Sequence, residues 1–298
     1  CSDLTSVHIS DIAAWCNIDF EDNSSNPINI FTKKLYSNGV LITDLVIPDG
    51  VNSVNSCAFY YCKSITSVTI PNSVKSIGNF AFKGCTSLKY LRIEDGEGTL
   101  SLGYNSYNSS GEGKGLFYDC PLETLYLGRN LSYNTSKEYG YSPFYNKSSL
   151  TSVTIGNSVT SIGDYAFREC LGLTNVVIGN SVTSIGNRAF YRCTDLTSVT
   201  IGNSVEVIGN YAFYECTKLK TVYNFSNLTF SRYSNNNGYV AYYATKVINA
   251  PNAVIDGDFI WCKLNGANTL ACYIGEVAEL TLPADYNGEN YVIGNDAF

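Results

Sequence analysis

The sequence contains no methionine, one histidine and two tryptophans among its 298 residues. Charged side chains make up only 15% of the chain, and the formal net charge is −7. Nucleic-acid binding requires a stripe of Lys and Arg, so this balance argues against that class of partner. A single histidine, His8, leaves too little material for a Ser-His-Asp triad or a histidine-based metal site, and we expect it to be an exposed surface residue.

Long apolar runs are missing as well. No stretch reaches the roughly 20 apolar residues that a membrane-spanning helix needs, and no segment has the apolar core of a secretion signal. Because methionine is lacking altogether, we expect the natural start of the protein to lie outside this sequence. The eleven cysteines include no CxxC pair, so we predict neither a metal site nor a cofactor.

What the sequence has in abundance is repetition. Three blocks are nearly identical: LTSVTIGNSVTSIGDYAFREC at 150–170, LTNVVIGNSVTSIGNRAFYRC at 173–193 and LTSVTIGNSVEVIGNYAFYEC at 196–216. Cys62 and Cys85 repeat the 23-residue spacing of the cysteines that end these blocks. One unit cannot bury its own apolar side chains, whereas stacked units can, so the pattern predicts a solenoid.

Each unit has a readable internal order. In the first block, Val153 and Ile155 alternate with Thr154, which predicts a short strand with one buried and one exposed face. A Gly-Asn turn follows the strand. Asp164 then occupies a position that suits the N-cap of a helix, and a short helical turn should carry Phe167 inward.

The strand segment recurs along the chain and gives about ten coils. We therefore predict an α+β repeat solenoid, with a parallel β-sheet on one face, short helical turns or short strands on the other, and inserted β-hairpins. The expected strands lie at Leu4–Ile9, Ile42–Ile47, Ile65–Ile70, Leu88–Ile93, Leu122–Leu127, Leu150–Ile155, Leu173–Ile178, Leu196–Ile201, Leu219–Tyr223 and Val277–Leu282.

Four segments interrupt the period and are expected to be insertions in one solenoid spanning residues 1–298, namely residues 10–41, 94–115, 129–146 and 224–276. Two of them carry Asn-Gly hairpin signals, at Asn38-Gly39 and Asn265-Gly266. The first residues match the tail of a unit and the last ones stop short of the expected cysteine, so we expect both ends to fall inside a unit. A lipid-modified Cys1 is the alternative explanation of the first residue.

The units ITSVTIPNSVKSIGNFAFKGC, at residues 65–85, and LTSVTIGNSVTSIGDYAFREC resemble the BspA-like leucine-rich repeat. The resemblance covers most of the chain, and the motif is specific to that family. It implies a leucine-rich-repeat right-handed coil stack in a secreted or cell-surface protein, typically bacterial, that adheres to host or bacterial partners. It supplies no catalytic residue, and it leaves the roles of residues 94–146 and 224–276 open.

Seven cysteines occupy the repeat position, and Lys147 stands in that position between Cys120 and Cys170. We interpret these cysteines as small buried side chains that fill the corner of each coil. Free thiols are unusual outside the cell, so unpaired repeat cysteines fit poorly with an extracellular location, and nothing in the sequence resolves this disagreement. Cys262 and Cys272 flank the second hairpin signal, and their spacing leaves open whether they form a disulfide.

The outward positions of the predicted sheet carry mostly Ser and Thr. Tyr90 and Arg92 on one coil, with Tyr126 on the next, break this pattern, and Tyr and Arg are enriched among residues that anchor interfaces. We predict a partner-binding patch at these three residues. The Tyr-rich loops of the same coils would add Tyr104, Tyr107, Tyr133, Tyr139 and Tyr141. Alternatively, all of these side chains only pack against their own insertions.

These features favour an extracellular protein-binding or adhesion module. It would present its β face and Tyr-rich loops to a protein or glycan partner on a host or neighbouring cell, as a monomer or with weak self-association. The alternative is a structural spacer or a self-assembling subunit of a surface layer or filament. An enzyme such as a glycosidase is disfavoured, because the acidic residues are scattered over turns and loops rather than paired across a cleft.

Overall fold

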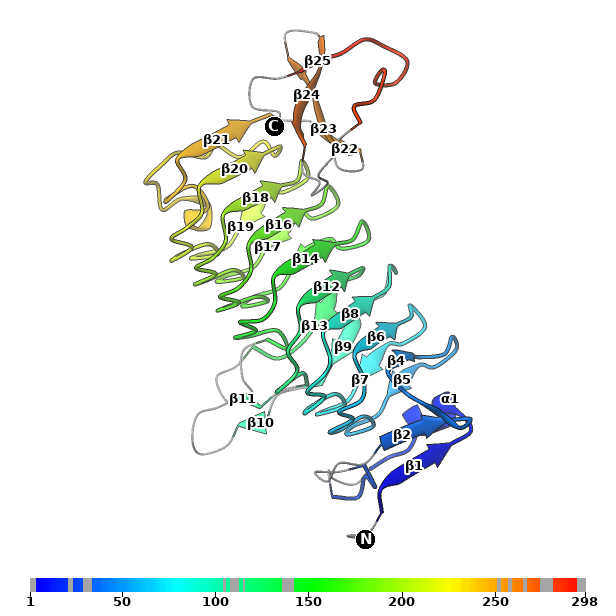
Figure 1. Ribbon diagram of the computed structural model, residues 1–298. Coiled ribbons are helices and arrows are strands. Elements are labelled where there is room, and N and C mark those ends of the chain that lie inside the picture. Colours follow the sequence, from blue (N-terminus) through cyan, green and yellow to red (C-terminus); the bar gives the residue numbers. More distant parts are fainter. Residues whose placement is uncertain are drawn as a thin grey trace.

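A computed structural model describes residues 4–20, 24–28, 34–103, 106–107, 113–114, 116–135, 142–250, 253–256, 259–264, 267–273 and 281–293. The chain winds into an elongated stack of coils that begins beside β1 (Ser6–Ile9) and ends at a small separate sheet (Figure 1). Within the described residues, no helix is long and apolar enough to cross a membrane.

A nine-stranded parallel sheet forms one face of the stack (Figure 1). In spatial order its strands are β4 (Asp44–Val46), β6 (Ser67–Ile70), β8 (Tyr90–Ile93), β12 (Thr124–Leu127), β14 (Ser152–Ile155), β16 (Asn175–Ile178), β18 (Ser198–Ile201), β20 (Thr221–Asn224) and β21 (Lys246–Asn249). Neighbouring strands pair in register, so Val153 lies beside Val176 and Val176 beside Val199. The repeat fold with stacked parallel strands is therefore confirmed.

The opposite face is built from shorter strands. One group consists of β5 (Ser53–Val54), β7 (Ser76–Ile77), β9 (Leu100–Leu102) and β13 (Leu131–Ser132), and the other of β15 (Ser161–Ile162), β17 (Ser184–Ile185) and β19 (Val207–Ile208). The expected α+β class is not confirmed. Within the described residues, helix is confined to α1 (Ile12–Cys16) and the short 3-10 turn η1 (Asn237–Tyr239).

The segment expected to be a helical turn is a run of tight turns instead. Tyr165 and Glu169 have positive φ angles of 58° and 60°, which no right-handed helix contains. The backbone N–H of Phe167 donates to the carbonyl of Ala189 in the next coil, at 2.7 Å. Asp164 does not cap a helix, because its carboxylate accepts the backbone N–H of Asn187 in the next coil, at 2.6 Å. Hydrogen bonds between coils have replaced those within a helix.

A ladder of phenylalanine rings runs through the core. The rings are buried and stack on their neighbours with centroids 5.0 to 5.8 Å apart. The ladder consists of Phe59, Phe82, Phe117, Phe144, Phe167, Phe190 and Phe213. Each unit thus contributes one ring to a core that continues from coil to coil, as expected for a solenoid.

The first expected insertion holds a confirmed hairpin. Strand β2 (Lys34–Ser37) pairs with β3 (Val40–Leu41) in antiparallel orientation, and Asn38 and Gly39 have the positive φ angles that a two-residue hairpin turn requires. The expectation that Leu4–Ile9 supplies a strand of the main sheet is wrong, since β1 pairs with β2 in a separate three-stranded sheet.

Parts of the expected insertions 94–115 and 129–146 belong to the repeating units of the solenoid. They contain β9 and β13, which belong to the second face of the solenoid. The first of them also holds a short hairpin made by β10 (Ser106–Tyr107) and β11 (Gly113–Lys114).

The segment 224–276 is likewise not a simple insertion, because η1 and β21 add a further coil. Beyond that coil, β22 (Val254–Asp256), β23 (Phe259–Leu264), β24 (Ala267–Tyr273) and β25 (Val292–Ile293) form a four-stranded sheet. Pairing of Leu264 with Ala267 confirms the second hairpin, although its two turn residues lie outside the described residues. Of the strand expected at Val277–Leu282, residues 277–280 also lie outside the described residues. Residues 281–282 are described and do not form a strand.

Candidate binding surfaces

The structure brings three of the predicted patch residues together on the outer face of the main sheet. Pairing of β8 with β12 places Arg92 directly opposite Tyr126. The Arg92 guanidinium carbon lies 4.1 Å from the centroid of the Tyr126 ring, which is cation–π geometry. Tyr90 lies one outward position earlier on β8, and half of its side chain is exposed, at 51%. We refer to Tyr90, Arg92 and Tyr126 as the sheet-face patch.

Neighbouring groups fix the orientation of the sheet-face patch. The Tyr126 hydroxyl donates to Asp95 Oδ2 at 2.7 Å, and this hydrogen bond raises the pKa of Tyr126 above its ordinary value. At the start of the same two strands, Lys89 forms an ion pair with Glu123 at 2.8 Å. The hydrogen bond to Asp95 therefore holds the aromatic ring on which Arg92 rests.

Of the remaining predicted tyrosines, the structure places Tyr133 away from this patch. Tyr133 follows β13 on the second face, where its hydroxyl donates to the Asp164 carbonyl at 3.1 Å and burial raises its pKa. Tyr133 is therefore a packing residue of the solenoid. The loop tyrosines Tyr104, Tyr139 and Tyr141 lie outside the described residues, and Tyr107 is described only as part of the backbone of β10.

A second aromatic surface was missed by the sequence reasoning. Along the turns between the two faces, Arg188 lies between Tyr165 and Tyr211, with its guanidinium carbon 5.9 and 5.2 Å from the two ring centroids. In the adjacent column, Arg168 lies 5.1 Å from the ring of Tyr191, which stacks in turn on Tyr214. We call these residues the tyrosine–arginine edge: Tyr145, Tyr165, Arg168, Arg188, Tyr191, Tyr211 and Tyr214.

The signal for this edge is present in the repeat alignment. Tyr165, Arg188 and Tyr211 share one repeat position, and Arg168, Tyr191 and Tyr214 share another. The sequence analysis considered only the outward positions of the predicted sheet, and these two columns lie on the turns that follow the strands.

The repeat cysteines that the structure describes are buried, as expected, and they also donate hydrogen bonds. The thiols of Cys85, Cys120, Cys170, Cys193 and Cys216 each donate to the carbonyl of a ladder phenylalanine in the preceding coil, at 3.0 to 3.2 Å. Burial raises the pKa of Cys62, Cys170 and Cys216 to about 12, so these thiols stay neutral and unreactive. Cys1 lies outside the described residues.

Lys147 takes over this role in its own coil, where it stands at the position of the cysteine. Its ammonium group donates to the carbonyl of Phe117, which is the equivalent acceptor. Burial lowers the pKa of Lys147 below the ordinary value for lysine.

The single histidine lies at the surface, beside an aromatic ring. His8 stacks on Tyr36 with ring centroids 4.6 Å apart and lies 3.2 Å from the Ser6 hydroxyl. Over the part of the chain that the structure describes, no group of three or more His, Cys, Asp or Glu side chains could hold a metal ion. Cys262 is a free thiol; the register sets it opposite Thr269 and sets Cys272 opposite Ile260.

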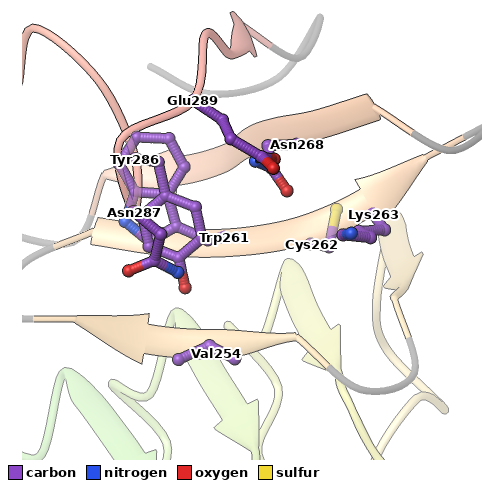
Figure 2. A pocket seen from close by; sticks show the side chains of 8 residues that line it. All are labelled: Val254, Trp261, Cys262, Lys263, Asn268, Tyr286, Asn287 and Glu289. Atoms are coloured by element: carbon purple, nitrogen blue, oxygen red, sulfur yellow. The ribbon is translucent and has the colours of Figure 1, made fainter.

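A cavity of about 530 Å³ opens in the four-stranded sheet beyond the last coil (Figure 2). It is lined by Val254, Trp261, Cys262, Lys263, Asn268, Tyr286, Asn287 and Glu289. No sequence pattern indicates this cavity, because its walls come from three strands, β22, β23 and β24, and from a loop about twenty residues further along the chain.

The repeat units match a known family. The model of the BspA type leucine-rich repeat region fits six copies, at residues 29–133 and 137–237, which is more than half of the chain. The chain belongs to the BspA-type leucine-rich repeat family. Proteins with this repeat are of the kind found on bacterial surfaces, and leucine-rich repeat proteins generally act as scaffolds rather than as enzymes.

Solved structures of bacterial leucine-rich repeat proteins are similar to this BspA-type chain. A leucine-rich cell surface protein from Faecalibacterium prausnitzii is 26% identical over 78% of this chain and 54% of its own, with a TM-score of 0.42. The present chain thus spans about half the length of that protein.

Two further solved structures are more distant. The leucine-rich repeat protein of T. pallidum is 23% identical over 71% of each chain, with a TM-score of 0.28. The pneumococcal vaccine antigen PcpA is 14% identical over 84% of this chain and 85% of its own, with a TM-score of 0.34. No curated protein matches the sequence.

Proposed function

We propose that this chain is a protein-binding module of a bacterial surface protein, and that it holds its partner at the sheet-face patch. The observation that carries the proposal is the stack of Arg92 on Tyr126, next to the exposed ring of Tyr90. Tyr and Arg dominate the residues that contribute most to interfaces, and they do so where neighbouring groups fix their orientation.

The surroundings of the patch support this choice. Around it, the outward positions of the main sheet carry small hydroxyl side chains, including Ser67, Thr69, Ser152, Thr154 and Ser198. Such a surface is flat and offers little to fill a pocket on a partner. The three large side chains of the sheet-face patch rise from it as a compact cluster, and the Tyr126 hydroxyl is already fixed by Asp95. Binding would therefore freeze few additional rotamers.

The proposal is tested with the double variant Tyr90→Ala, Arg92→Ala. The intact chain and the variant are passed over an array of host extracellular-matrix and bacterial surface proteins, and bound partners are measured by surface plasmon resonance. If each side chain contributes about 2 kcal/mol, as interface anchors do, binding should weaken by roughly 30-fold per residue. Thermal stability should change little, because Tyr90 and Arg92 are exposed.

A matched control removes the same two residue types elsewhere. The double variant Arg188→Ala, Tyr211→Ala, on the tyrosine–arginine edge, should keep full affinity for the partner. Binding that survives loss of the sheet-face patch, or that is lost in the edge variant alone, would overturn the proposed site. Concentration-dependent assembly of the intact chain in sedimentation, without any partner, would favour a self-assembling structural subunit instead.

A further inference from the structure

We propose that the cavity in the four-stranded sheet is a second binding site, and that its ligand is a neutral saccharide. This inference is independent of the protein-binding function proposed above, because the cavity lies beyond the last coil and shares no residue with the sheet-face patch.

The aromatic wall of the cavity is rigid. Trp261 stacks on Tyr286, with ring centroids 4.3 Å apart and an angle of 13° between the planes. Tyr291 meets the same indole edge-on, at 4.8 Å, and its hydroxyl donates to the Pro283 carbonyl at 2.8 Å. Trp261 is 2% exposed, so the wall is anchored in the small core of this sheet. Trp261 thus supports the half-buried ring of Tyr286 from behind, and the Tyr286 ring is the flat surface on which the C–H face of a sugar ring can pack.

The loop that carries Tyr286 also delivers the main polar group. Asn287 and Gly288 have positive φ angles and form a two-residue turn, with Tyr286 and Glu289 bonded to each other through their backbones. Residues paired across such a turn present their side chains on the same side. Glu289 therefore stands beside the aromatic wall rather than behind it (Figure 2).

A buried amide fixes this carboxylate. Asn268, on β24, is 8% exposed, and its side-chain nitrogen donates to Glu289 Oε2 at 2.8 Å. Asn287 and Lys263 complete the described polar lining. Carboxylate oxygens accept hydrogen bonds, whereas amide and ammonium groups donate them, and the amides also accept. Sugar hydroxyls both donate and accept, so this mixture suits neighbouring hydroxyls of one ring.

The charge of the cavity selects among polar ligands. Its described lining carries one cation, Lys263, and one anion, Glu289, so it offers no net positive charge to an acidic sugar or a phosphate. Its volume of about 530 Å³ lies in the range of sites for small organic ligands, and a few convergent polar groups beside an apolar wall are typical of them. A neutral sugar of one or two rings satisfies the size, the wall and the polar set together.

The experiment uses Trp261 as a built-in reporter. The chain has two tryptophans, and Trp15 lies in α1, where its indole donates to the Ala58 carbonyl at the other end of the stack. In the Trp15→Phe variant, emission therefore reports on the cavity alone. It is titrated with glucose, galactose, mannose, N-acetylglucosamine, lactose and maltose, with sialyllactose and triglycine as charged comparisons. Calorimetric titration of the unaltered chain with the same compounds guards against damage from the substitution.

The expected result is a saturable change in emission with at least one neutral sugar. Glu289→Gln should weaken that binding about tenfold or more, because it removes a charged hydrogen-bond acceptor. The matched control Glu206→Gln makes the same change at an exposed position directly before β19 and should leave binding intact.

Binding of sialyllactose or triglycine alone, of none of the compounds, or equally by the Glu289→Gln variant would overturn the proposal. The Tyr90→Ala, Arg92→Ala variant should bind the sugar normally, so failure of the saccharide site and failure of the protein-binding site remain distinguishable.

Discussion

At the scale of single residues, the repeat cysteine is a hydrogen-bond donor as much as a small apolar side chain. Its thiol donates to the carbonyl of a ladder phenylalanine in the preceding coil, as Cys193 does to Phe167 at 3.2 Å. A buried carbonyl without a donor destabilises the fold. Lys147 supports this interpretation, because it stands in place of the cysteine and donates to the equivalent acceptor, the carbonyl of Phe117.

The raised thiol pKa values predict how stability depends on pH. In the unfolded chain these cysteines should titrate near their ordinary value of 9, whereas in the folded chain Cys62, Cys170 and Cys216 titrate at about 12. Above pH 9 the unfolded state therefore loses protons that the folded state keeps. The free energy of unfolding should be constant below this range. It should fall as the pH rises from about 9 towards 12, by about 1.4 kcal/mol per pH unit for each thiol.

The measurement is urea denaturation under reducing conditions at several pH values between about 8 and 10.5. Lys147 has the opposite effect on the free energy of unfolding, because burial lowers its pKa and its contribution to stability therefore rises with pH. It is one group against several thiols, so the fall should dominate. The variant Lys147→Cys removes that opposing group and adds a thiol, so its stability should fall more steeply with pH. A free energy of unfolding that stays flat up to about pH 10.5 would contradict the neutral-thiol ladder.

At the scale of one coil, the close approach of neighbouring turns requires particular glycines. A Cβ atom added to Gly186 would lie 2.5 Å from the backbone nitrogen of Asp164, which is far inside contact distance. Backbone atoms cannot rotate out of the way as a side chain can. The variant Gly186→Ala should therefore lower the free energy of unfolding by about 1–3 kcal/mol, measured by denaturant titration.

A control glycine lies in the same coil. A Cβ atom on Gly179 would meet its nearest neighbour, the Ile155 carbonyl oxygen, at an ordinary 3.5 Å. The variant Gly179→Ala should be neutral or stabilise the chain by up to about 1 kcal/mol, because alanine restricts the unfolded backbone. Equal losses in the two variants would show that the close approach of neighbouring coils does not explain the requirement for glycine at Gly186.

The strands could be predicted because their signal is local. Val153 and Ile155 alternate with Thr154, and the same pattern recurs in the clear repeat units, so the strand and its inward face follow from the sequence there. Strand β21 lacks such a pattern and falls in a segment expected to be an insertion. The turn that follows could not be predicted in the same way. Asp164 is equally suited to cap its own helix or to bond Asn187, which is 23 residues away, and only the stacked coils decide between them.

The two candidate sites differ in the same way: one follows from the repeat register and the other from tertiary packing. Tyr90, Arg92 and Tyr126 were brought together correctly because parallel strands in register fix which residues are neighbours. The cavity could not be predicted, because Asn268 meets Glu289 through tertiary packing of a loop that has no repeat.

At the scale of the whole molecule, each coil contacts mainly its neighbours, so stability should be a sum of coil and interface contributions. The phenylalanine ladder makes this explicit. Phe144 stacks on Phe117 on one side and on Phe167 on the other, at 5.6 and 5.8 Å. Phe213 stacks on one ladder ring, Phe190, at 5.0 Å. Removing a ring from the middle therefore weakens two interfaces, whereas removing the last ring weakens one ring–ring interface.

We predict that Phe144→Ala divides the solenoid into two separately unfolding halves. Loss of a buried phenylalanine typically costs about 3–5 kcal/mol, and here that loss falls on the interfaces that couple the coils on either side. Hydrogen exchange of the native protein should show reduced protection on both sides of residue 144, and thermal unfolding should change from one transition to two. Phe213→Ala, which removes the same ring at the end of the ladder, should reduce protection mainly in the last coils and keep a single transition. If both variants lose protection uniformly along the whole chain, the coils unfold as one cooperative unit, and stability cannot be divided among neighbouring pairs.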